Sequence, residues 1–228
     1  MKSLNRITTA DGSHSILSDK FGVSYHSIHG ALQETQHVFI NAGLKLKALT
    51  SPSVSILDIG FGTGLNAFAT ILEARRRNLT VYYHAVEAFP LEFSVISGLN
   101  YPALLGGEEE TNLFESLHTS EWGAPLMLSD TFTLFKDLSL FQELEVNKSF
   151  DLIYYDAFAP SAQPELWEEP ILSKMYELLG PDGVLVTYCA KGVFKRTLKA
   201  VGFTVEALPG PPGKREMTRA IKLVHETG

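Results

Sequence analysis

The sequence predicts an α/β fold: a mostly parallel, seven-stranded sheet with helices on both faces. Two observations lead to this prediction. From Ser53 onward, short apolar segments alternate with helical segments, and this alternation is typical of parallel strands joined by crossover helices. The 228 residues are also 45% hydrophobic and 20% charged. That balance is typical of a globular protein large enough to bury a sizeable core.

The elements follow one another in a regular order along the chain. The predicted strands cover residues 54–59, 81–86, 124–128, 150–155, 184–188, 203–208 and 220–224, with helices over 65–77, 166–179 and 193–200. Gly180-Pro-Asp-Gly183 predicts a turn after the helix that ends at 179, because glycine and proline interrupt regular structure. The acidic run Glu108–Glu110 is interpreted as a solvated loop.

The first fifty residues differ from this pattern. Asp11-Gly12 favours a small hairpin turn, and residues 30–49 contain a helical run. We therefore divide the chain into an N-terminal extension, 1–50, and a main domain, 51–228. We expect the extension to pack at the active-site edge of the sheet, near the carboxyl ends of the strands.

Composition excludes several classes of protein. No apolar stretch approaches the roughly 20 residues of a membrane-spanning helix, and residues 1–10 lack the apolar core of a signal peptide. Cys189 is the only cysteine, so an internal disulfide is excluded. The seven histidines have no metal-ligand spacing. We expect a cytoplasmic protein without a metal or a membrane partner.

Charge is unevenly distributed. The net charge is −7, but residues 189–228 carry +5 and the rest of the chain −12. Such asymmetry is typical of a basic face that binds nucleic acid, although a solvated surface helix and loop would have the same charge. The basic residues that we expect to contact a phosphate backbone are Lys191, Lys195, Lys214 and Arg215.

A glycine-rich loop follows the first strand of the main domain. Asp58 precedes Gly60, Gly62 and Gly64, and Leu65 stands where a dinucleotide-binding loop has its last glycine. The pattern resembles the S-adenosylmethionine loop of class I methyltransferases, a Rossmann-like fold. In that loop, glycines let the backbone approach the cofactor. A tight strand-to-helix turn without a ligand is the alternative.

Carboxylates follow two further predicted strands. Glu87 ends the second strand, where a carboxylate would accept the ribose hydroxyls of a nucleoside cofactor. Asp130 follows the third, where the adenine would lie. Either residue alone could be a helix cap. Because ligands bind at the carboxyl ends of the strands in open α/β sheets, we interpret Glu87 and Asp130 as cofactor-binding residues.

Asp156 stands in a proline-bearing turn after the strand 150–155. In class I enzymes that methylate amines, an aspartate or asparagine at this point holds the acceptor nitrogen in line with the methyl group. We predict Asp156 as the catalytic residue, although it could simply cap the turn. Phe158 and Trp167 could stack a nucleobase, or pack in the core. Tyr188 could line the pocket.

The chain as a whole resembles the methyltransferase domain of the MnmC family of tRNA-modifying proteins. The resemblance is carried by Gly30–Phe39, Gly60–Asn66, Glu87–Pro90, Tyr155–Pro160 with Pro164 and Trp167, and Gly213–Met217. It implies methyl transfer from S-adenosylmethionine to the exocyclic amine of 5-aminomethyl(-2-thio)uridine at the tRNA wobble position. It also implies that Asp156 is the active-site aspartate and that Asn66 belongs to the cofactor site.

The resemblance has one departure. The bifunctional members continue into a flavin-dependent oxidoreductase domain, which this sequence lacks, so we expect a separate oxidoreductase to supply the aminomethyl form. Two alternative functions remain: a small-molecule amine transferase of the same fold, and an inactive RNA-binding module. Binding of tRNA would discriminate against the first, and binding of the cofactor against the second.

Overall fold

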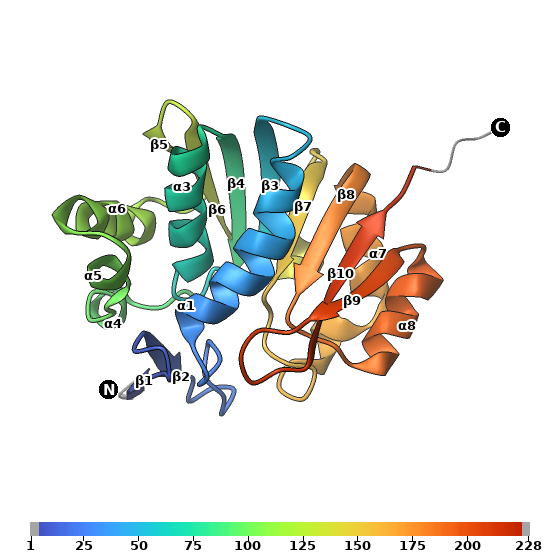
Figure 1. Cartoon of the computed structure of the whole chain (residues 1–228), viewed down its shortest axis with the longest axis horizontal. Coiled ribbons are helices and arrows are strands. Elements are labelled where there is room, and N and C mark those ends of the chain that lie inside the picture. Colours follow the sequence, from blue (N-terminus) through green and yellow to red (C-terminus); the bar gives the residue numbers. More distant parts are fainter. Residues whose placement is uncertain (1–4, 225–228) are drawn as a thin grey trace.

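A computed structural model of the chain describes residues 5–224. Residues 1–4 of the predicted extension lie outside the described residues. Between 5 and 224, one eight-stranded sheet has the order β5-β6-β4-β3-β7-β8-β10-β9, and β1 and β2 form a separate hairpin (Figure 1). The strands are β1 Asn5–Thr8, β2 His14–Leu17, β3 Ser53–Ile59, β4 Thr80–Glu87, β5 Pro125–Ser129, β6 Phe132–Leu138, β7 Phe150–Tyr155, β8 Leu179–Thr187, β9 Thr204–Pro209 and β10 Glu216–Lys222.

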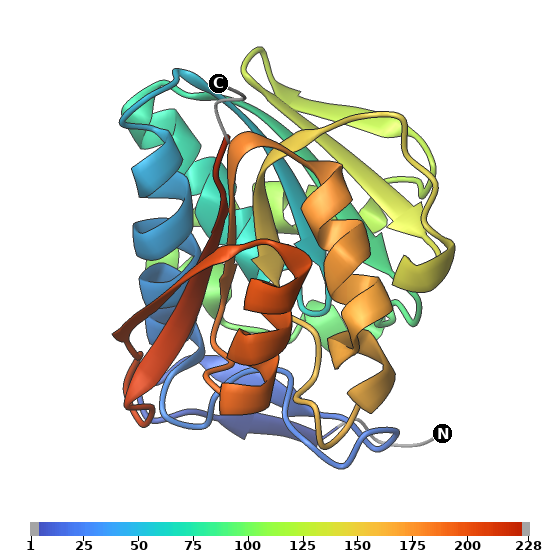
Figure 2. The same cartoon turned by 90° about the vertical axis from the view of Figure 1, so that its right-hand side faces the viewer.

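Helices cover both faces of the large sheet, as Figure 2 shows. The helical segments are α1 Ala31–Glu34, η1 Thr35–Leu44, α2 Lys45–Lys47, α3 Leu65–Arg77, α4 Phe93–Ile96, α5 Tyr101–Leu105, α6 Glu108–Thr119, η2 Phe141–Glu143, η3 Pro164–Trp167, α7 Glu169–Leu178 and α8 Gly192–Val201. Of these, α1, η1 and α2 form one continuous helical segment, whose η1 part is π-helical. The segment η1 and helix α3 lie on one face, and α7 and α8 lie on the other.

The central strand β7 explains the two-sided core. Leu152 and Tyr154 belong to the hydrophobic cluster that includes residues of η1 and α3. Ile153 and Tyr155 belong to the cluster that includes residues of α7 and α8. Successive side chains of a strand point to opposite faces, so a strand with apolar residues on both faces must be covered on both. The predicted α/β fold with helices on both faces is therefore confirmed.

The N-terminal region is part of the same packed body. Segment η1 lies against β8 and β7, and a Cβ atom at Gly43 would come within 3.1 Å of Val186 and 3.3 Å of Leu152. Residues of β2, α1 and η1 share one hydrophobic cluster with the sheet. The described part of residues 1–50 thus has no hydrophobic core of its own, and it reaches the edge of the sheet where the strands end.

The predicted third strand is wrong in position. Residues 125–129 form β5, an antiparallel edge strand, whereas β6 pairs in parallel with β4 and occupies the third-strand position. In β6, buried and half-buried residues alternate along Phe132–Leu138, as expected of a strand. The sheet therefore has one strand more than the seven predicted. Strands β5 and β10 are antiparallel to their neighbours.

Two loop predictions are also wrong. Gly180–Gly183 lies inside β8, where the pairing with β7 shifts register between Phe150 and Leu152 and so absorbs the extra residues as a bulge. The acidic run from Glu108 begins helix α6. Glutamates are favoured in a first helical turn because they interact with the positive end of the helix dipole, so the run is a helix start.

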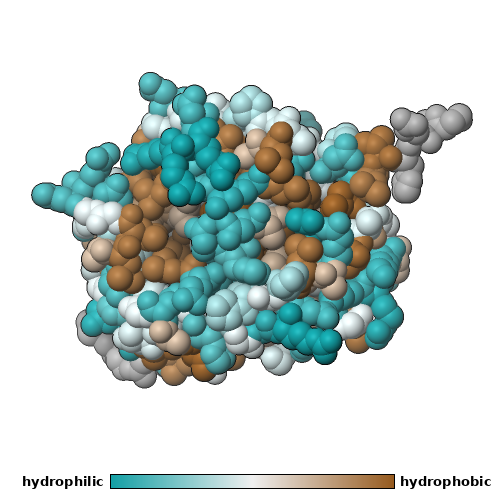
Figure 3. All heavy atoms as spheres, in the orientation of Figure 1, coloured by the Kyte–Doolittle hydropathy of each residue, from teal (hydrophilic) through white to brown (hydrophobic). Residues whose placement is uncertain are grey.

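Within residues 5–224, no helix is both long and apolar enough to cross a membrane. In the same range, no three His, Cys, Asp or Glu side chains are grouped as metal ligands. On the face drawn in Figure 3, hydrophilic residues separate several smaller apolar groups.

Candidate active site

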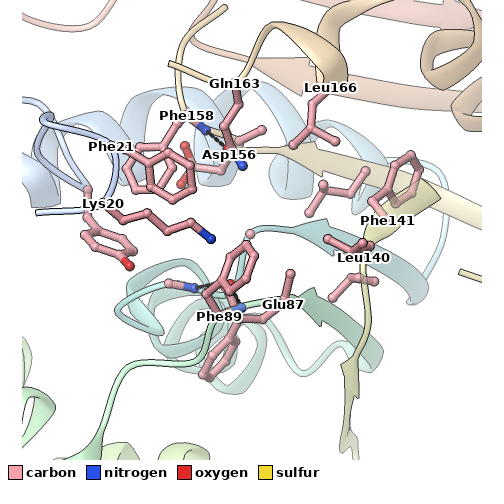
Figure 4. A pocket seen from close by; sticks show the side chains of 18 of the residues that line it. Lys20, Phe21, Glu87, Phe89, Leu140, Phe141, Asp156, Phe158, Gln163 and Leu166 are labelled. Atoms are coloured by element: carbon pink, nitrogen blue, oxygen red, sulfur yellow. Dashed lines mark hydrogen bonds between the residues drawn. The ribbon is translucent and has the colours of Figure 1, made fainter. Parts of the chain in front are cut away.

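A cavity of about 240 Å³ opens at the carboxyl ends of β3, β4, β6 and β7 (Figure 4). This edge lies where chain order reverses in the sheet, the usual ligand position in open α/β folds. Residues from five parts of the chain line the cavity. They are Lys20, Phe21, Tyr25 and His26; Ile59–Thr63 and Asn66; Val86–Phe89; Ser139–Gln142; and Asp156–Phe158 with Gln163, Glu165 and Leu166.

The glycine loop forms one wall of the cavity. Gly60 has φ +98° and passes so close to the next strand end that a Cβ atom would lie 3.0 Å from the backbone oxygen of Asp156. Gly64 has φ +73° at the start of α3, and a Cβ there would lie 2.5 Å from His118 Nε2. Both positions require the left-handed conformation that glycine adopts readily. The loop therefore approaches the cavity with backbone and little side chain.

Glu87 joins the end of β4 to this loop. Its Oε2 accepts a hydrogen bond from the N–H of Gly62 at 3.0 Å, and its Oε1 accepts one from the N–H of Phe89 at 2.8 Å. A carboxylate oxygen can accept more than one hydrogen bond. Glu87 can therefore still accept hydroxyl groups from a ligand in the cavity while it holds the loop in place.

Asp156 stands across the cavity from Glu87. Asn66 Nδ2 donates to Asp156 Oδ2 at 2.8 Å, and Thr35 Oγ1 donates to Asn66 Oδ1 at 3.0 Å. Burial of its carboxyl group, followed by the negative charge of Glu34, raises the pKa of Asp156 well above its usual range. The chain of hydrogen bonds fixes one oxygen of Asp156 and connects it to the N-terminal helical segment.

Asp58 does not line the cavity. It is fully buried behind the glycine loop, where Tyr83 Oη donates to its Oδ2 at 2.7 Å and its Oδ1 has no partner among the described residues. Burial raises the pKa of Asp58 to about 8. The side-chain hydrogen bond of Asp58 thus joins β3 to β4 through Tyr83.

The cofactor prediction for Asp130 is wrong. This residue is exposed in the turn between β5 and β6, and Thr131 beside it bonds to Val81 at the amino end of β4. Asp130 thus lies at the opposite edge of the sheet from the cavity. The residues that follow β6, the true third strand, are Ser139–Gln142, and they line the cavity.

No sequence motif indicates the cavity residues of the N-terminal segment. Phe21 packs on Phe158 with ring centroids 4.5 Å apart, and Tyr25 packs on the same ring at 5.0 Å. His26 Nε2 shares a hydrogen bond with Thr63 Oγ1 at 2.5 Å, and burial lowers the pKa of His26 to about 4. The only signal for this segment was the expected packing of the extension at the active-site edge.

The three predicted aromatic residues lie in different places. Phe158 lines the cavity. Trp167 is buried, donates from Nε1 to the Phe158 backbone oxygen at 2.9 Å, and packs between Tyr155 and Phe194, so its ring belongs to the core and is not placed to stack a base. Tyr188 is half-buried and donates to the Ala157 backbone oxygen at 2.8 Å.

The four predicted phosphate contacts also separate into two kinds. Lys195 Nζ pairs with Glu216 at 2.6 Å, and Lys214 Nζ pairs with Glu34 at the same distance. Lys191 and Arg215 are exposed, and no ion pair involves them within residues 5–224. Two of the four charges are thus already used inside the protein, and two are available to a partner.

The cavity suits a nucleoside that carries a charged aliphatic chain. Leu140 and Phe141 offer an apolar surface for a flat base, Glu87 can accept two hydroxyls, and the glycine loop offers room beside its backbone. A mostly apolar cavity with a few convergent polar groups is typical of a small-molecule site. The residues present therefore fit S-adenosylmethionine.

Comparisons with known proteins agree with this geometry. A family model for S-adenosyl-L-methionine-dependent methyltransferases matches residues 130–223. The chain is 31% identical over 211 residues to the tRNA 5-methylaminomethyl-2-thiouridine biosynthesis bifunctional protein MnmC of Leptospira borgpetersenii, covering 88% of this chain and 32% of that protein. It is 30% identical over 215 residues to MnmC of Chromobacterium violaceum, covering 89% of this chain and 32% of that protein.

Among solved structures, the crystal structure of MnmC2 from Aquifex aeolicus matches with a TM-score of 0.79 and 26% identity, over 97% of this chain and 71% of that one. The chain spans about a third of the length of the MnmC relatives. Its fold is the class I, Rossmann-like methyltransferase fold, and its cofactor is S-adenosylmethionine.

Proposed function

We propose that this chain, a methyltransferase related to the methyltransferase region of the MnmC proteins, methylates the exocyclic amine of 5-aminomethyl(-2-thio)uridine at the wobble position of tRNA. The product is 5-methylaminomethyl(-2-thio)uridine. The observation that carries the proposal is the position of Asp156: its carboxylate is held by Asn66 at the wall of the cavity that also contains the glycine loop and Glu87.

Asp156 has one oxygen for the acceptor. Asn66 bonds to Oδ2, and Oδ1 has no partner within residues 5–224, so it can accept an N–H from the acceptor amine. The amine attacks in its neutral form, because an ammonium has no lone pair. When bound, S-adenosylmethionine would supply the methyl group to this nitrogen, and its sulfur would keep the electron pair of the carbon–sulfur bond that breaks. Asp156 stabilises the positive charge that develops on nitrogen.

The residues around Asp156 mainly orient the reactants and take little part in bond making. S-adenosylmethionine brings an already activated methyl group, so the protein contributes mainly alignment of the two reactants. Phe158 borders the cavity beside Asp156 and offers a face for the acceptor uracil. Outside the cavity, Lys191 and Arg215 are available for phosphates, which position a nucleic acid without specifying its sequence.

The decisive experiment is incubation of the protein with labelled S-adenosylmethionine and tRNA that carries or lacks the aminomethyl group. We expect label on the modified uridine of the first tRNA only. The free 5-aminomethyluridine nucleoside is the second substrate to test, and it should react poorly because it has no phosphate backbone. Equal turnover of the nucleoside and the tRNA would instead identify a small-molecule amine transferase.

Replacement of Asp156 tests the assignment of the catalytic residue. Asp156→Ala should lower kcat by on the order of 100-fold, because it removes a group that acts in the transition state. The affinity for S-adenosylmethionine, measured by calorimetry, should stay within about threefold. If affinity falls as much as kcat/KM while kcat is retained, Asp156 is a cofactor-binding residue.

A further inference from the structure

The loop between β9 and β10, residues 210–215, is fastened to the N-terminal helical segment beside the active site. Lys214 Nζ lies 2.6 Å from Glu34 Oε1. Just before the loop, the backbone oxygen of Pro209 lies 2.8 Å from His37 Nε2. The loop backbone also packs against His29, since a Cβ at Gly213 would overlap its ring. The loop thus has a fixed place, and Lys214 points into the protein.

Glu34 is an unusual partner because its side chain is only 5% exposed. Its Oε2 accepts the N–H of Ser27 at 3.0 Å. A buried carboxylate is costly unless a charge or hydrogen bonds compensate it, and Lys214 supplies that charge. The ammonium group also lies 3.8 Å from the ring centroid of Tyr188, which bonds to the residue after Asp156.

The charges of Glu34 and Lys214 both affect the ionisation of Asp156. The negative charge of Glu34 raises the pKa of Asp156, and the positive charge of Lys214 lowers it. The link is also structural: Thr35, the residue after Glu34, bonds to Asn66, which holds Asp156. Glu34 and Lys214 therefore influence the point at which the acceptor nitrogen is expected to lie.

The charge matters because of the form in which the amine reacts. An alkyl amine, like a lysine side chain, is protonated at neutral pH, and it must lose that proton before it attacks. Nearby carboxylates favour the ammonium form, and a nearby cation disfavours it. If no cation neutralised Glu34, the negative charges of Glu34 and Asp156 would together stabilise the protonated, unreactive ammonium form of the acceptor.

We propose that Lys214 is a positioning residue for methyl transfer: by neutralising the buried Glu34, it leaves Asp156 as the one carboxylate that acts on the acceptor, so that the acceptor amine deprotonates more readily. This inference rests on the proposed amine acceptor. It differs from the phosphate contact predicted for Lys214 from the sequence, because the ammonium group is committed to an internal partner.

Other ionisable groups face the same region and are common to all the variants compared below. They are Asp58 from β3, Glu87 at the end of β4, Tyr188 and Cys189 after β8, Tyr83 from β4, Lys191 before α8, Asp11 and His29 from the N-terminal region, and Lys20, Tyr25, His26 and Glu165 from the cavity wall. Because these groups do not change, a difference between variants reports on Glu34 and Lys214 alone.

The test is the dependence of kcat/KM on pH with aminomethyl-bearing tRNA. Lys214→Met should move the rising limb of the profile to higher pH by roughly one unit, the size of effect expected for a charge within a few ångströms. Lys214→Arg keeps the charge and should keep the wild-type profile. The double change Glu34→Gln with Lys214→Met removes both charges and should return the limb close to its wild-type position.

A matched control uses the same hairpin. Arg219 on β10 pairs with Glu206 at 2.6 Å, so Arg219→Met removes an equally short ion pair whose charges are not among those that shift the pKa of Asp156. Its profile should match that of wild type. Thermal unfolding of each variant shows whether it is folded. An unshifted profile in Lys214→Met, or an equal shift in Arg219→Met, would overturn the inference.

A second measurement needs no acceptor and separates this inference from the proposed function. The protein is labelled with ¹³C-aspartate, and the Asp156 carboxyl signal is identified by its absence in Asp156→Asn. Titration should give a higher pKa for Asp156 in Lys214→Met and a lower one in Glu34→Gln. If wild type fails to methylate the tRNA but these shifts appear, the proposed function is wrong, while the effect of Glu34 and Lys214 on the pKa of Asp156 is confirmed. If neither variant shifts the pKa, the inference is wrong.

Discussion

Among the individual residues, Glu87 shapes the glycine loop, and we propose that it also binds the cofactor. It accepts the N–H groups of Gly62 and Phe89, and so holds the glycine loop against the end of β4. It also lines the cavity, and its oxygens can accept further hydrogen bonds. If it binds the ribose hydroxyls as proposed, the same carboxylate links the shape of the loop to the presence of the cofactor.

Glu87→Ala should therefore weaken S-adenosylmethionine binding by roughly 1.5–3 kcal/mol, the value of hydrogen bonds to a charged group, or about 10- to 150-fold in Kd. Glu87→Gln, which keeps one acceptor oxygen, should lose less. Calorimetry measures both affinities. A change of under about threefold in Glu87→Ala would show that the carboxylate only caps the loop.

Asp58 predicts a pH effect on stability. Its pKa is about 8 in the folded protein because of burial, against about 3.9 in an unfolded chain. A raised pKa stabilises the fold at low pH, and this contribution is lost as pH rises toward 8, since the unfolded state releases its proton first. Asparagine cannot ionise and can still accept the Tyr83 hydrogen bond.

The stability of Asp58→Asn relative to wild type should therefore increase steadily between pH 4 and pH 8. Urea unfolding at several pH values gives the difference, in which contributions from all other groups cancel. Two parallel curves would mean that Asp58 ionises in the folded protein as it does in the unfolded chain.

The sequence predicts the position of a site residue where that residue lies at the end of a correctly predicted strand. Glu87 ends one strongly apolar central strand and Asp156 directly follows another, so the strand prediction places both at the carboxyl edge of the sheet. The prediction for Asp130 is wrong because the sequence indicates residues 124–128, and not β6, as the third strand. Lys214 could not be placed, since no local pattern indicates an ion pair with a residue 180 positions away.

At the level of elements, the segment between β2 and α1 covers the mouth of the cavity. Phe21 bridges Phe158, at 4.5 Å between ring centroids, and Phe89, at 6.5 Å. Lys20 Nζ lies 2.9 Å from the Phe89 ring centroid, and Figure 4 shows its side chain directed into the space between the two walls. A cofactor in the cavity would lie beneath these contacts.

Phe21→Ala should therefore accelerate cofactor dissociation by roughly 3- to 10-fold, the value of about one aromatic contact, with little change in the association rate. Stopped-flow fluorescence with S-adenosylhomocysteine measures both rates. Phe93→Ala is a suitable control, because Phe93 is 39% exposed and does not line the cavity. Equal dissociation rates in all three proteins would show that the segment does not retain the cofactor.

Elements differed in how well they could be predicted, and the reason is their burial. Strand β7 and helix α3 were predicted at their observed bounds, because continuous or periodic apolar patterns identify fully covered elements. Strand β5, at the edge of the sheet, and β6 beside it have half-buried faces and weaker patterns. The glycines at 180–183 predicted a turn, but these residues form a bulge inside β8, between Leu179 and Val184, which pair with β7.

For the whole molecule, the positive charge near the carboxyl terminus is partly consumed by internal pairs. Lys195, Lys214 and Arg219 pair with glutamates. A count of basic residues along the sequence therefore overestimates the number of side chains that are available to the phosphates of a nucleic acid. The exposed side chains of Lys191 and Arg215 come from the start of α8 and the loop before β10. A tRNA that presents its anticodon uridine to Asp156 should meet both.

Affinity for tRNA should accordingly fall with salt, by about 0.7 to 0.9 log units per phosphate contact for each log unit of salt. The double change Lys191→Ala with Arg215→Ala should reduce this slope by roughly one to two, while the affinity for S-adenosylmethionine is unchanged. Lys214→Met should leave the slope as in wild type, because its charge already neutralises Glu34. Filter binding between 50 and 300 mM salt measures all three slopes. A reduced slope in Lys214→Met alone would place the phosphate contact on Lys214 and would mean that its pairing with Glu34 opens when tRNA binds.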